Sequence, residues 1–456
     1  MKRLLITLFC IVMFGFSKSK DYSPNSIGDV VLKGTFGQSV KMKSGKMFLY
    51  EVIGNENYVL DSVNVTSQGF IFKSRSFPTG VYRLSYNNQT NSLDFVINSN
   101  ETNNLIVKIN SNRIQNNFQF ENSIENEIKK AYDKQEKSIQ SKIKLIKKSN
   151  KSRDQKIAEM KILQRELYDF GVSLHTDHPG TYYGMILSHM LSPNEHIAHL
   201  YFNDINFSDA SIIRSGLLPA RIQQYIQTFN DIKNNQYGFH DAVDVVMDYA
   251  IANEKVAEFC MYNMLDGFYN TGQTSGDKIW QDLCNYIMDN YIFGEGCGDD
   301  IEPSALLKER ANKYKNLQVG NIPPNFIIKD LNGNLVNLNK VASNNKYTVL
   351  MFWASHCNHC MQELPGFSSW YNKNSNLDIE IVAVSLDANK NKWEKTVSDN
   401  NFNWINICEF QVYKSPICKD YKIKKTPSIF VLNRKMEIVL KPKSTNQLRS
   451  FLTSNK

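Results

Sequence analysis

Apolar and polar residues alternate in short runs near the start of the chain. Between residues 27 and 112 these runs include KMFLYEVI, GFIFKSRS and VYRLSYN, and glycine or asparagine separates them. A period of two is typical of strands with one buried face, and turn residues at roughly 8–12-residue spacing are typical of small all-β units. The pattern predicts an antiparallel β-sandwich accessory domain over residues 27–112, which contain neither histidine nor cysteine.

The period changes after residue 118. Ile124, Ile128 and Tyr132 recur every four residues, as they would on one face of a helix, and further helical stretches follow. We expect a helical accessory region over residues 118–316. Its strongly basic stretch, residues 137–156, is interpreted as a solvated helix face, with contact to anionic lipid as the alternative.

A third pattern begins after "QVGNIPPNF", residues 318–326, where tandem prolines disfavour helix. Continuous apolar runs such as KYTVLMFW, DIEIVAVSL and TPSIFVLN now alternate with helical stretches, and Asn332-Gly333 predicts a hairpin turn. Buried strands separated by helices indicate parallel pairing, here with antiparallel strands at one side. The chain is thus predicted to be multidomain, with an α/β domain over residues 320–456.

The amino-terminal residues indicate export. Lys2 and Arg3 precede an apolar run, Leu4–Phe16, which is short for a membrane span and has the length of a signal-peptide core. Residues 1–19 are predicted to be a signal peptide, and the protein is expected in the periplasm or cell envelope. Lipoprotein anchoring through Cys10 is less favoured, because a bulky phenylalanine stands directly before it.

Charge and cysteine usage narrow the classes of function. The formal charge of +8 is spread over many lysines without an arginine–aromatic cluster, so no nucleic-acid partner is expected. Eight cysteines in 456 residues are too few for a disulfide-dense scaffold, so each needs a local explanation. Buried thiols or one structural disulfide are the open interpretations for three that lack motif spacing, Cys260, Cys284 and Cys297.

Two histidine pairs have a spacing that zinc sites use. They are His175 with His178 and His196 with His199, but no cysteine or acidic residue at a suitable spacing completes either pair. We therefore expect no metal and no other cofactor. The segment DHPG, residues 177–180, is predicted to be a turn before a helix.

The motif that carries chemistry is FWASHCNHC, residues 352–360. It places Cys357 after a buried strand and at a helix start, where unpaired backbone N–H groups favour a thiolate. Cys360 lies one turn further and can resolve a mixed disulfide, while His356 and His359 can add positive charge. A redox pair is favoured over a metal site, whose consecutive ligands would be cramped. It is also favoured over a structural disulfide, whose short loop constrains the unfolded chain little.

Together with this motif, the segments CMQELP and KKTPSIFVL give residues 320–455 a resemblance to a known family. They resemble the TlpA/ResA-type thioredoxin-like thiol–disulfide oxidoreductases, in the multidomain exported form of Bacteroidota. The resemblance implies a thioredoxin-like fold with a set of catalytic residues, Cys357, Cys360, Glu363 and Pro427. The candidate supporting residues are Trp353, Thr426, His356 and His359.

Three of these residues carry specific expectations from the resemblance. Glu363 would assist proton transfer at the buried thiol, with a solvated carboxylate as the alternative. The bond before Pro427 would be cis. His356 departs from the family pattern, in which an aromatic residue, usually tryptophan, stands before the first cysteine.

The expected activity follows from the same resemblance. It implies protein thiols and disulfides as substrates, an inner-membrane electron donor, and action on the reductase or isomerase side. The alternatives are a thiol peroxidase of the same fold and a cell-envelope binding protein with a vestigial thioredoxin domain. ASHCNHC lacks the Thr/Pro-x-x-x-Thr/Ser-x-x-Cys setting expected of a peroxidatic cysteine.

A second cysteine pair lies in the same domain. Cys408 and Cys418 flank a loop that precedes the TPSIFVLN strand. We predict a structural disulfide between them, with a relay of electrons as the alternative.

Overall fold

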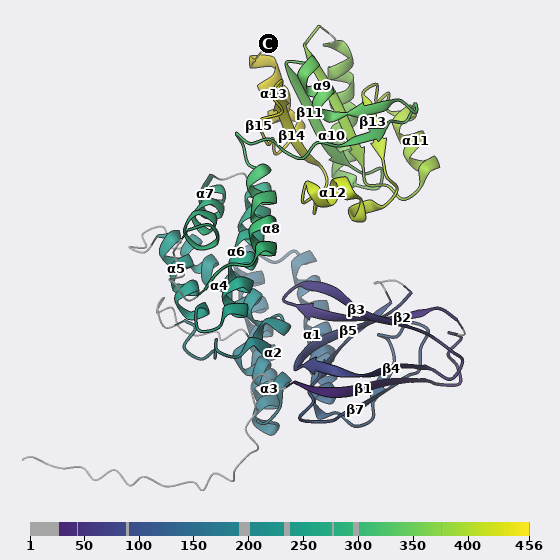
Figure 1. Ribbon diagram of the computed structural model, residues 1–456, viewed down its shortest axis with the longest axis vertical. Helices are drawn as coiled ribbons and strands as arrows, with labels where there is room; N and C mark the ends of the chain where they lie inside the picture. Colours follow the sequence, from purple (N-terminus) through teal and green to yellow (C-terminus); the bar gives the residue numbers. More distant parts are fainter. Residues whose placement is uncertain are drawn as a thin grey trace, which may run out of the picture. The chain divides into compact units, whose positions relative to one another are not determined.

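The computed structural model describes residues 27–455, except 43, 88–90, 191–200, 232–237, 276–277, 295–300 and 375. The predicted signal peptide, Cys297, His196 and His199 lie outside the described residues. The chain forms two compact units. Figure 1 labels their helices and strands. The first is Met1–Gly238 with Asp244–Val256, and the second is Phe239–Val243 with Ala257–Lys456.

The first unit begins with two four-stranded sheets, ordered β4-β1-β7-β8 and β3-β2-β5-β6. Alternate residues of both sheets, such as Leu32 and Leu49, belong to one buried hydrophobic cluster. The prediction of strands in this region is therefore confirmed. Their bounds are β1 Ile27–Phe36, β2 Lys46–Ile53, β3 Glu56–Asn64, β4 Phe70–Pro78, β5 Gly80–Tyr86, β6 Ser92–Ile97, β7 Asn104–Ile109 and β8 Phe118–Phe120.

One strand pairing departs from the predicted antiparallel arrangement. β1 pairs with β7 in parallel, and Leu32 lies opposite Leu105. Alternation shows which face of a strand is buried, but it does not show which distant strand becomes the neighbour. β1 and β7 are far apart in sequence, so no hairpin turn imposes an antiparallel direction on them.

The helices of the first unit start at side-chain caps. Ser123 caps α1, and Ser152 forms a capping box with Gln155 at the start of α2. DHPG is the predicted turn, because α2 ends at Asp177 with His178 as its C-cap, and Thr181 caps α3. The helices are α1 Ile124–Lys148, α2 Arg153–Asp177, α3 Tyr182–His189 and α4 Leu217–Asp231, preceded by a short 3-10 helix, Ala210–Arg214.

A buried carboxylate joins two of these helix starts. Glu125 in α1 accepts hydrogen bonds from the backbone N–H groups of Tyr182 and Tyr183 at 2.7 and 2.8 Å. The amide of Asn98 donates to the same carboxylate at 2.8 Å. Burial raises the pKa of Glu125 to about 7, despite these donors. The group ties α1 to α3 and has no cysteine or histidine among these partners.

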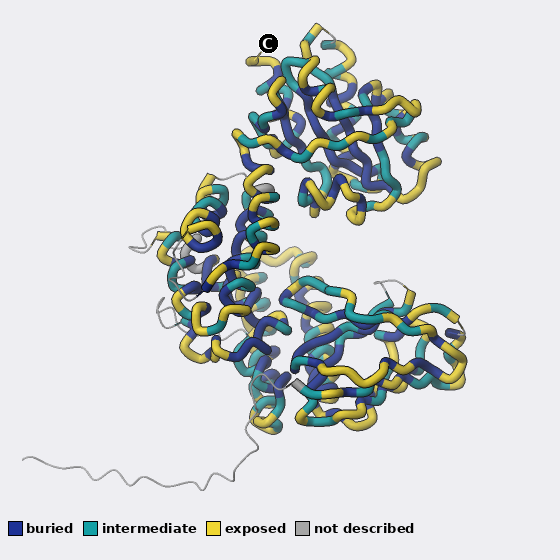
Figure 2. Tube along the Cα trace, in the orientation of Figure 1, coloured by how far each residue is buried: buried dark blue, intermediate teal, exposed yellow. Residues whose placement is uncertain are grey.

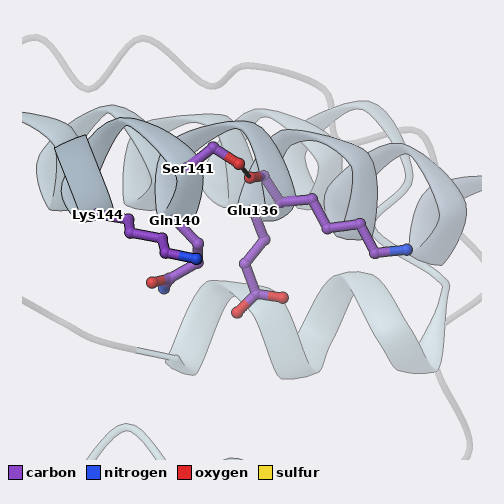
Figure 3. A pocket seen from close by; sticks show the side chains of 5 residues that line it. Glu136, Gln140, Ser141 and Lys144 are labelled. Atoms are coloured by element: carbon purple, nitrogen blue, oxygen red, sulfur yellow. Dashed lines mark hydrogen bonds between the residues drawn. The ribbon is translucent and has the colours of Figure 1, made fainter. Parts of the chain in front are cut away.

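The basic stretch lies mainly on α1, and Figure 3 shows part of it. A shallow hollow there is lined by polar side chains from one helix face, including Glu136, Gln140 and Lys144. The hydroxyl of Ser141 donates to the carbonyl oxygen of Lys137 at 2.8 Å, so it is satisfied within its own helix. This arrangement agrees with the interpretation of a solvated helix face.

The second unit contains most of the remaining helices and a five-stranded sheet. Its helices before the sheet are α6 Glu254–Ser275, α7 Lys278–Ile287 and α8 Ala305–Asn316, and a short π-helix, Met288–Ile292, follows α7. α5, Phe239–Ala250, has residues in both units. Cys260 and Cys284 are buried free thiols in α6 and α7, and burial raises the pKa of Cys284 to about 12. For Cys260 and Cys284, the structure therefore agrees with the interpretation as buried thiols.

The sheet of the second unit has the order β13-β12-β11-β14-β15. β11, β12 and β13 run parallel, and β14 and β15 are antiparallel to their neighbours, as the sequence predicted. The hairpin β9–β10 precedes them, with Gly333 at φ +83° in its turn. The strands are β9 Ile327–Lys329, β10 Leu335–Asn337, β11 Tyr347–Trp353, β12 Ile379–Ser385, β13 Ile405–Cys408, β14 Ser428–Asn433 and β15 Ile438–Leu440.

Helices cover both faces of this sheet, which is why its three central strands, β12, β11 and β14, are mostly buried (Figure 2). Val349, Met351 and Trp353 face a cluster that includes α10 and α13, while Phe352 packs against Tyr421 beyond α12. The helices are α9 Leu338–Asn344, α10 Asn358–Lys373, α11 Lys390–Asp399, α12 Pro416–Asp420 and α13 Thr445–Ser454. None of the helices within the described ranges is long and apolar enough to cross a membrane.

Candidate active site

The first cysteine of the motif caps a helix. β11 ends at Trp353, and Cys357 is the N-cap residue of α10, with extended backbone angles of φ −82° and ψ 104°. The backbone N–H of Cys360 donates to the Cys357 sulfur at 3.2 Å. A sulfur at this position receives a donor that the helix itself cannot satisfy, and this stabilises a thiolate over a thiol.

The second cysteine lies behind the first. Cys360 is fully buried among the residues that α10 packs against the sheet, whereas Cys357 is partly exposed. The two are joined by a disulfide with a Cα–Cα distance of 5.3 Å. An incoming sulfur can therefore meet Cys357 first, and Cys360 is placed to displace it.

A loop from the other side of the sheet reaches the first cysteine. The carbonyl oxygen of Thr426 lies 3.4 Å from the Cys357 sulfur. The Thr426–Pro427 peptide bond is cis, as the resemblance implied, and β14 begins at the next residue. Thr426 is thus brought to the Cys357 sulfur from 69 residues away.

Both histidines of the motif are mostly exposed, and each faces a carboxylate. The His356 ring nitrogen Nδ1 lies 3.4 Å from Asp387, and His359 Nε2 lies 3.2 Å from Glu363 one turn along α10. Their side chains are 58% and 59% exposed, so solvent screens each pair. An imidazolium at either position would place positive charge close to the helix start.

Asp387 is a site residue that sequence reasoning missed. It follows β12, is 2% exposed, and accepts hydrogen bonds from the backbone N–H and the hydroxyl of Ser355 at 2.9 and 2.6 Å. The hydroxyl of Ser385 donates to it at 2.7 Å. Burial alone would raise the pKa of Asp387, but the hydrogen bonds outweigh it, and the pKa lies below its ordinary value.

A sequence signal for Asp387 did exist. It directly follows the buried strand DIEIVAVSL, and β12 pairs in parallel with β11. Neighbouring parallel strands end at the same edge of a sheet, which brings Asp387 to the segment before Cys357. Its bonds to Ser355 hold that segment in place.

Glu363 is held by two partners. Its carboxylate accepts the backbone N–H of Thr445 at 2.9 Å, the first residue of α13, and lies 3.2 Å from His359. The side chain is 20% exposed, so the alternative of a freely solvated carboxylate does not describe it. Its position, one turn beyond Cys360 on α10, remains compatible with the predicted role in proton transfer.

Trp353 lies beneath the motif rather than at its surface. It is fully buried at the end of β11, and its ring meets that of Phe402 edge-on at 5.3 Å. Its carbonyl oxygen accepts the backbone N–H of Leu386 at 2.8 Å. These contacts fix the strand end from which the Cys357 segment departs.

The predicted disulfide between Cys408 and Cys418 is a prediction that the structure contradicts. Both are free thiols. The Cys408 sulfur is directed at the carbonyl oxygen of Asp387, 3.4 Å away, and Cys418 is buried in α12. Burial raises the pKa of Cys418 to about 11 and also raises that of Cys408. Closeness in sequence did not reveal that the two side chains take different partners.

The structure describes one of the two histidine pairs. His175 lies in α2, and His178 is the C-cap of that helix. The second pair, His196 and His199, lies outside the described residues. Within residues 27–455, apart from the gaps given above, no group of three or more His, Cys, Asp or Glu residues is placed to hold a metal ion.

Comparison with known proteins gives one consistent result. Residues 344–438 match the family model described as thioredoxin-like. Sporulation thiol-disulfide oxidoreductase A of Bacillus subtilis is 29% identical over 136 residues, which are 28% of this chain and 79% of that protein. Thiol-disulfide oxidoreductase ResA of Bacillus cereus is 27% identical over 148 residues, or 31% and 80% of the two chains.

Solved structures similar to the chain include a thioredoxin domain of a thiol-disulfide oxidoreductase from Bacteroides vulgatus. It is 25% identical, covers 30% of this chain and 96% of its own, and has a TM-score of 0.28. StoA from Bacillus subtilis is 27% identical, with coverages of 28% and 97% and a TM-score of 0.25. Residues 344–438 are thus similar to the thioredoxin-like family, and the sequence relatives of this part of the chain are thiol-disulfide oxidoreductases.

Proposed function

We propose that the protein reduces or isomerises disulfides of exported proteins through Cys357 and Cys360. The observation that carries this proposal is that the two cysteines at the start of α10 differ in solvent exposure. A partly exposed sulfur caps the helix beside the Thr426–Pro427 loop, and a buried sulfur stands behind it. This is the arrangement that a nucleophile and its resolving thiol require.

The reaction begins from the reduced pair. The Cys357 thiolate attacks one sulfur of a substrate disulfide, a Cys357–substrate bond forms, and the other substrate sulfur leaves with the electron pair and takes up a proton. The Cys360 thiolate then attacks Cys357 and releases the second substrate thiolate. Two electrons pass to the substrate, and the Cys357–Cys360 disulfide remains.

Turnover requires that this disulfide be reduced again. We assign that step to an inner-membrane electron donor, and we place the protein in the periplasm or cell envelope because of the leader pattern in residues 1–19. Glu363 serves as the group that accepts the Cys360 proton. His356 and His359 stabilise the thiolate form when they are protonated.

The amino-terminal part is assigned an accessory role. Its two sheets share one hydrophobic cluster, which supports a β-sandwich domain over residues 27–112. The described cysteines and the candidate site all lie beyond residue 250. We assign this region and the helices after it to the orientation or selection of protein substrates.

The test is insulin reduction by the full chain with a thiol reductant as electron source. Activity that disappears in Cys357→Ser and persists in Cys408→Ser supports the proposal. Retention of activity in Cys357→Ser would refute it. Reduction of hydrogen peroxide that exceeds insulin reduction would favour a thiol peroxidase instead.

A further inference from the structure

A cavity of about 720 Å³ lies beside the loop that contacts the nucleophile. One wall is formed by Lys425, Pro427 and Ser428. These residues flank Thr426, whose carbonyl oxygen is 3.4 Å from the Cys357 sulfur. The residues that flank a substrate cysteine bonded to Cys357 would lie near this loop, which forms one wall of the cavity.

The opposite wall comes from α6 and α7 and is aromatic. Phe268, Tyr269 and Trp280 line it, and the rings of Phe268 and Trp280 are 5.8 Å apart. Such a wall accommodates apolar side-chain atoms.

Within the second unit, three contacts join α6 and α8 to the loop before Pro427 and to the residue after β15. Lys424 and Asp266 form an ion pair at 2.6 Å. The amine of Lys422 lies 4.8 Å from the centre of the Tyr314 ring, and that of Lys441 lies 4.8 Å from the centre of the Tyr269 ring. The two walls are therefore joined by charge-assisted contacts.

The lining carries an excess of positive charge. It includes four lysines, Lys278, Lys425, Lys441 and Lys443. The carboxylate of Asp282, also in the lining, already lies 2.8 Å from a ring nitrogen of His240. Lys441 is partly buried, and burial lowers its pKa to about 7. An anionic neighbour would favour its charged form.

One buried donor in the lining has no partner. Gln318 is 6% exposed, and its side-chain Nε2 forms no hydrogen bond to any residue that the structure describes. A buried N–H group without an acceptor is destabilising, so such groups mark places where an acceptor binds. The cavity thus offers amines and an amide donor above an aromatic wall.

We propose that this cavity is a second substrate subsite, which binds an acidic side chain on an extended segment of the protein substrate next to its reacting cysteine. The carboxylate would meet the lysine amines and the Gln318 amide, and the apolar part of the segment would lie on the aromatic wall. This inference rests on the proposed function. It adds a rule for the sequence around the substrate cysteine.

The test uses the Cys360→Ser variant of the full chain and two matched synthetic peptides. Each peptide carries one cysteine as a mixed disulfide with 5-thio-2-nitrobenzoate, flanked by glutamates in one peptide and by lysines in the other. The Cys357 thiolate attacks the peptide sulfur, the new disulfide forms, and thionitrobenzoate leaves with the electron pair. Its absorbance gives the rate, and mass spectrometry of the adduct gives the site.

We expect the glutamate peptide to react about five times faster at low salt, which is the size of a few partly exposed charge pairs. Lys278→Glu/Lys443→Glu should abolish this preference, and Gln318→Met should reduce it. The matched control, Lys395→Glu, changes an exposed lysine of α11 that does not line the cavity, and it should keep the preference.

Equal rates for the two peptides would overturn the subsite, provided that Cys357 reacts normally with the small disulfide 5,5′-dithiobis(2-nitrobenzoate). A preference that survives Lys278→Glu/Lys443→Glu would overturn it as well. Failure of Cys357 to react even with the small disulfide would refute the proposed function and the subsite that depends on it.

Discussion

Two helix starts in the thioredoxin-like domain are built alike but differ in their chemistry. At α10 the backbone N–H of Cys360 donates to the side chain of Cys357, and at α12 that of Cys418 donates to the side chain of Ser415, both at 3.2 Å. Each has a cap residue followed three positions later by cysteine. One has sulfur at the cap and the other has oxygen.

The residues around the two helix starts also differ. At α12 the carboxylate of Glu409 accepts the hydroxyl of Ser415 and, at 3.3 Å, the backbone N–H of Ile417. The donors at that helix start are therefore already paired with an anion. At α10 the cap position itself is the sulfur, which can become the anion. The two starts thus differ in where the cysteine stands that could become a thiolate: Cys357 is itself the cap of α10, whereas Cys418 lies one turn inside α12 behind a serine cap.

The largest expected effect is a difference in thiol reactivity between the two starts. In the reduced protein, Cys357 should be alkylated faster than Cys418 by a factor on the order of 10³ or more at pH 7. Thiols at helix starts have pKa values of roughly 3.5–7.5, whereas burial raises the pKa of Cys418 to about 11. Time-resolved mass spectrometry after iodoacetamide treatment measures both rates, and faster modification of Cys418 would contradict the comparison.

The next largest effect concerns the support of the α10 start. Asp387→Asn should lower the free energy of unfolding by about 1–3 kcal/mol at pH 7, because it weakens the bonds from Ser355 and Ser385. The folded-state pKa of Asp387 is depressed, so its contribution is present above the unfolded pKa of about 3.9 and is lost as pH falls through the folded value.

Urea unfolding of both proteins at pH 7, 5 and below 3.9 tests this sign. The difference in free energy of unfolding between the parent and Asp387→Asn should be constant from pH 7 to pH 5 and become smaller at the lowest pH. The control is Asp399→Asn, an exposed aspartate in α11, which should change little at any pH. A gap that grows as pH falls would show that Asp387 is not the group responsible.

A smaller effect is expected at the second cysteine pair. The double substitution Cys408→Ser/Cys418→Ser should lower the free energy of unfolding by about 1–3 kcal/mol. A hydroxyl then replaces the buried thiol of Cys418 and needs a hydrogen-bond partner there. Insulin reduction should remain close to that of the parent, since neither thiol touches the Cys357–Cys360 pair in any described contact. Loss of turnover with an unchanged melting temperature would instead support the alternative that Cys408 and Cys418 relay electrons.

The smallest effect concerns the charge beside α10. His359→Ala should make the Cys357–Cys360 disulfide less oxidising by about 20 mV, which corresponds to ~1 kcal/mol of thiolate stabilisation near a helix start. Equilibration of the full chain in glutathione buffers measures the potential. Lys392→Ala, an exposed change on α11, is the control, and an unchanged potential in His359→Ala would show that His359 does not stabilise the Cys357 thiolate.

The sequence predicted local features of this domain well, because they depend on neighbours along the chain. The apolar run before Cys357 became β11, the next residues became α10, and Asn332-Gly333 formed the turn of a hairpin. The cis bond at Pro427 was also correct, although it came from the family resemblance rather than from propensity.

The features that were missed depend on residues far apart in sequence. Asp387 meets Ser355 only because β11 and β12 are parallel and end at the same edge. Cys408 turns toward the Asp387 carbonyl, a contact that no spacing reveals. The parallel pairing of β1 with β7 likewise depends on a crossover that alternation cannot encode.

Asp266 has a consequence for how the protein is divided experimentally. Its carboxylate binds the amine of Lys424 and accepts the hydroxyl of Tyr314, so α6, α8 and the loop before Pro427 share one carboxylate. A fragment cut at residue 320 would retain Lys424 but lose both Asp266 and Tyr314. We therefore expect removal of the residues before 320 to change the loop beside Cys357. The kinetic constants of such a fragment would then differ from those of the full chain.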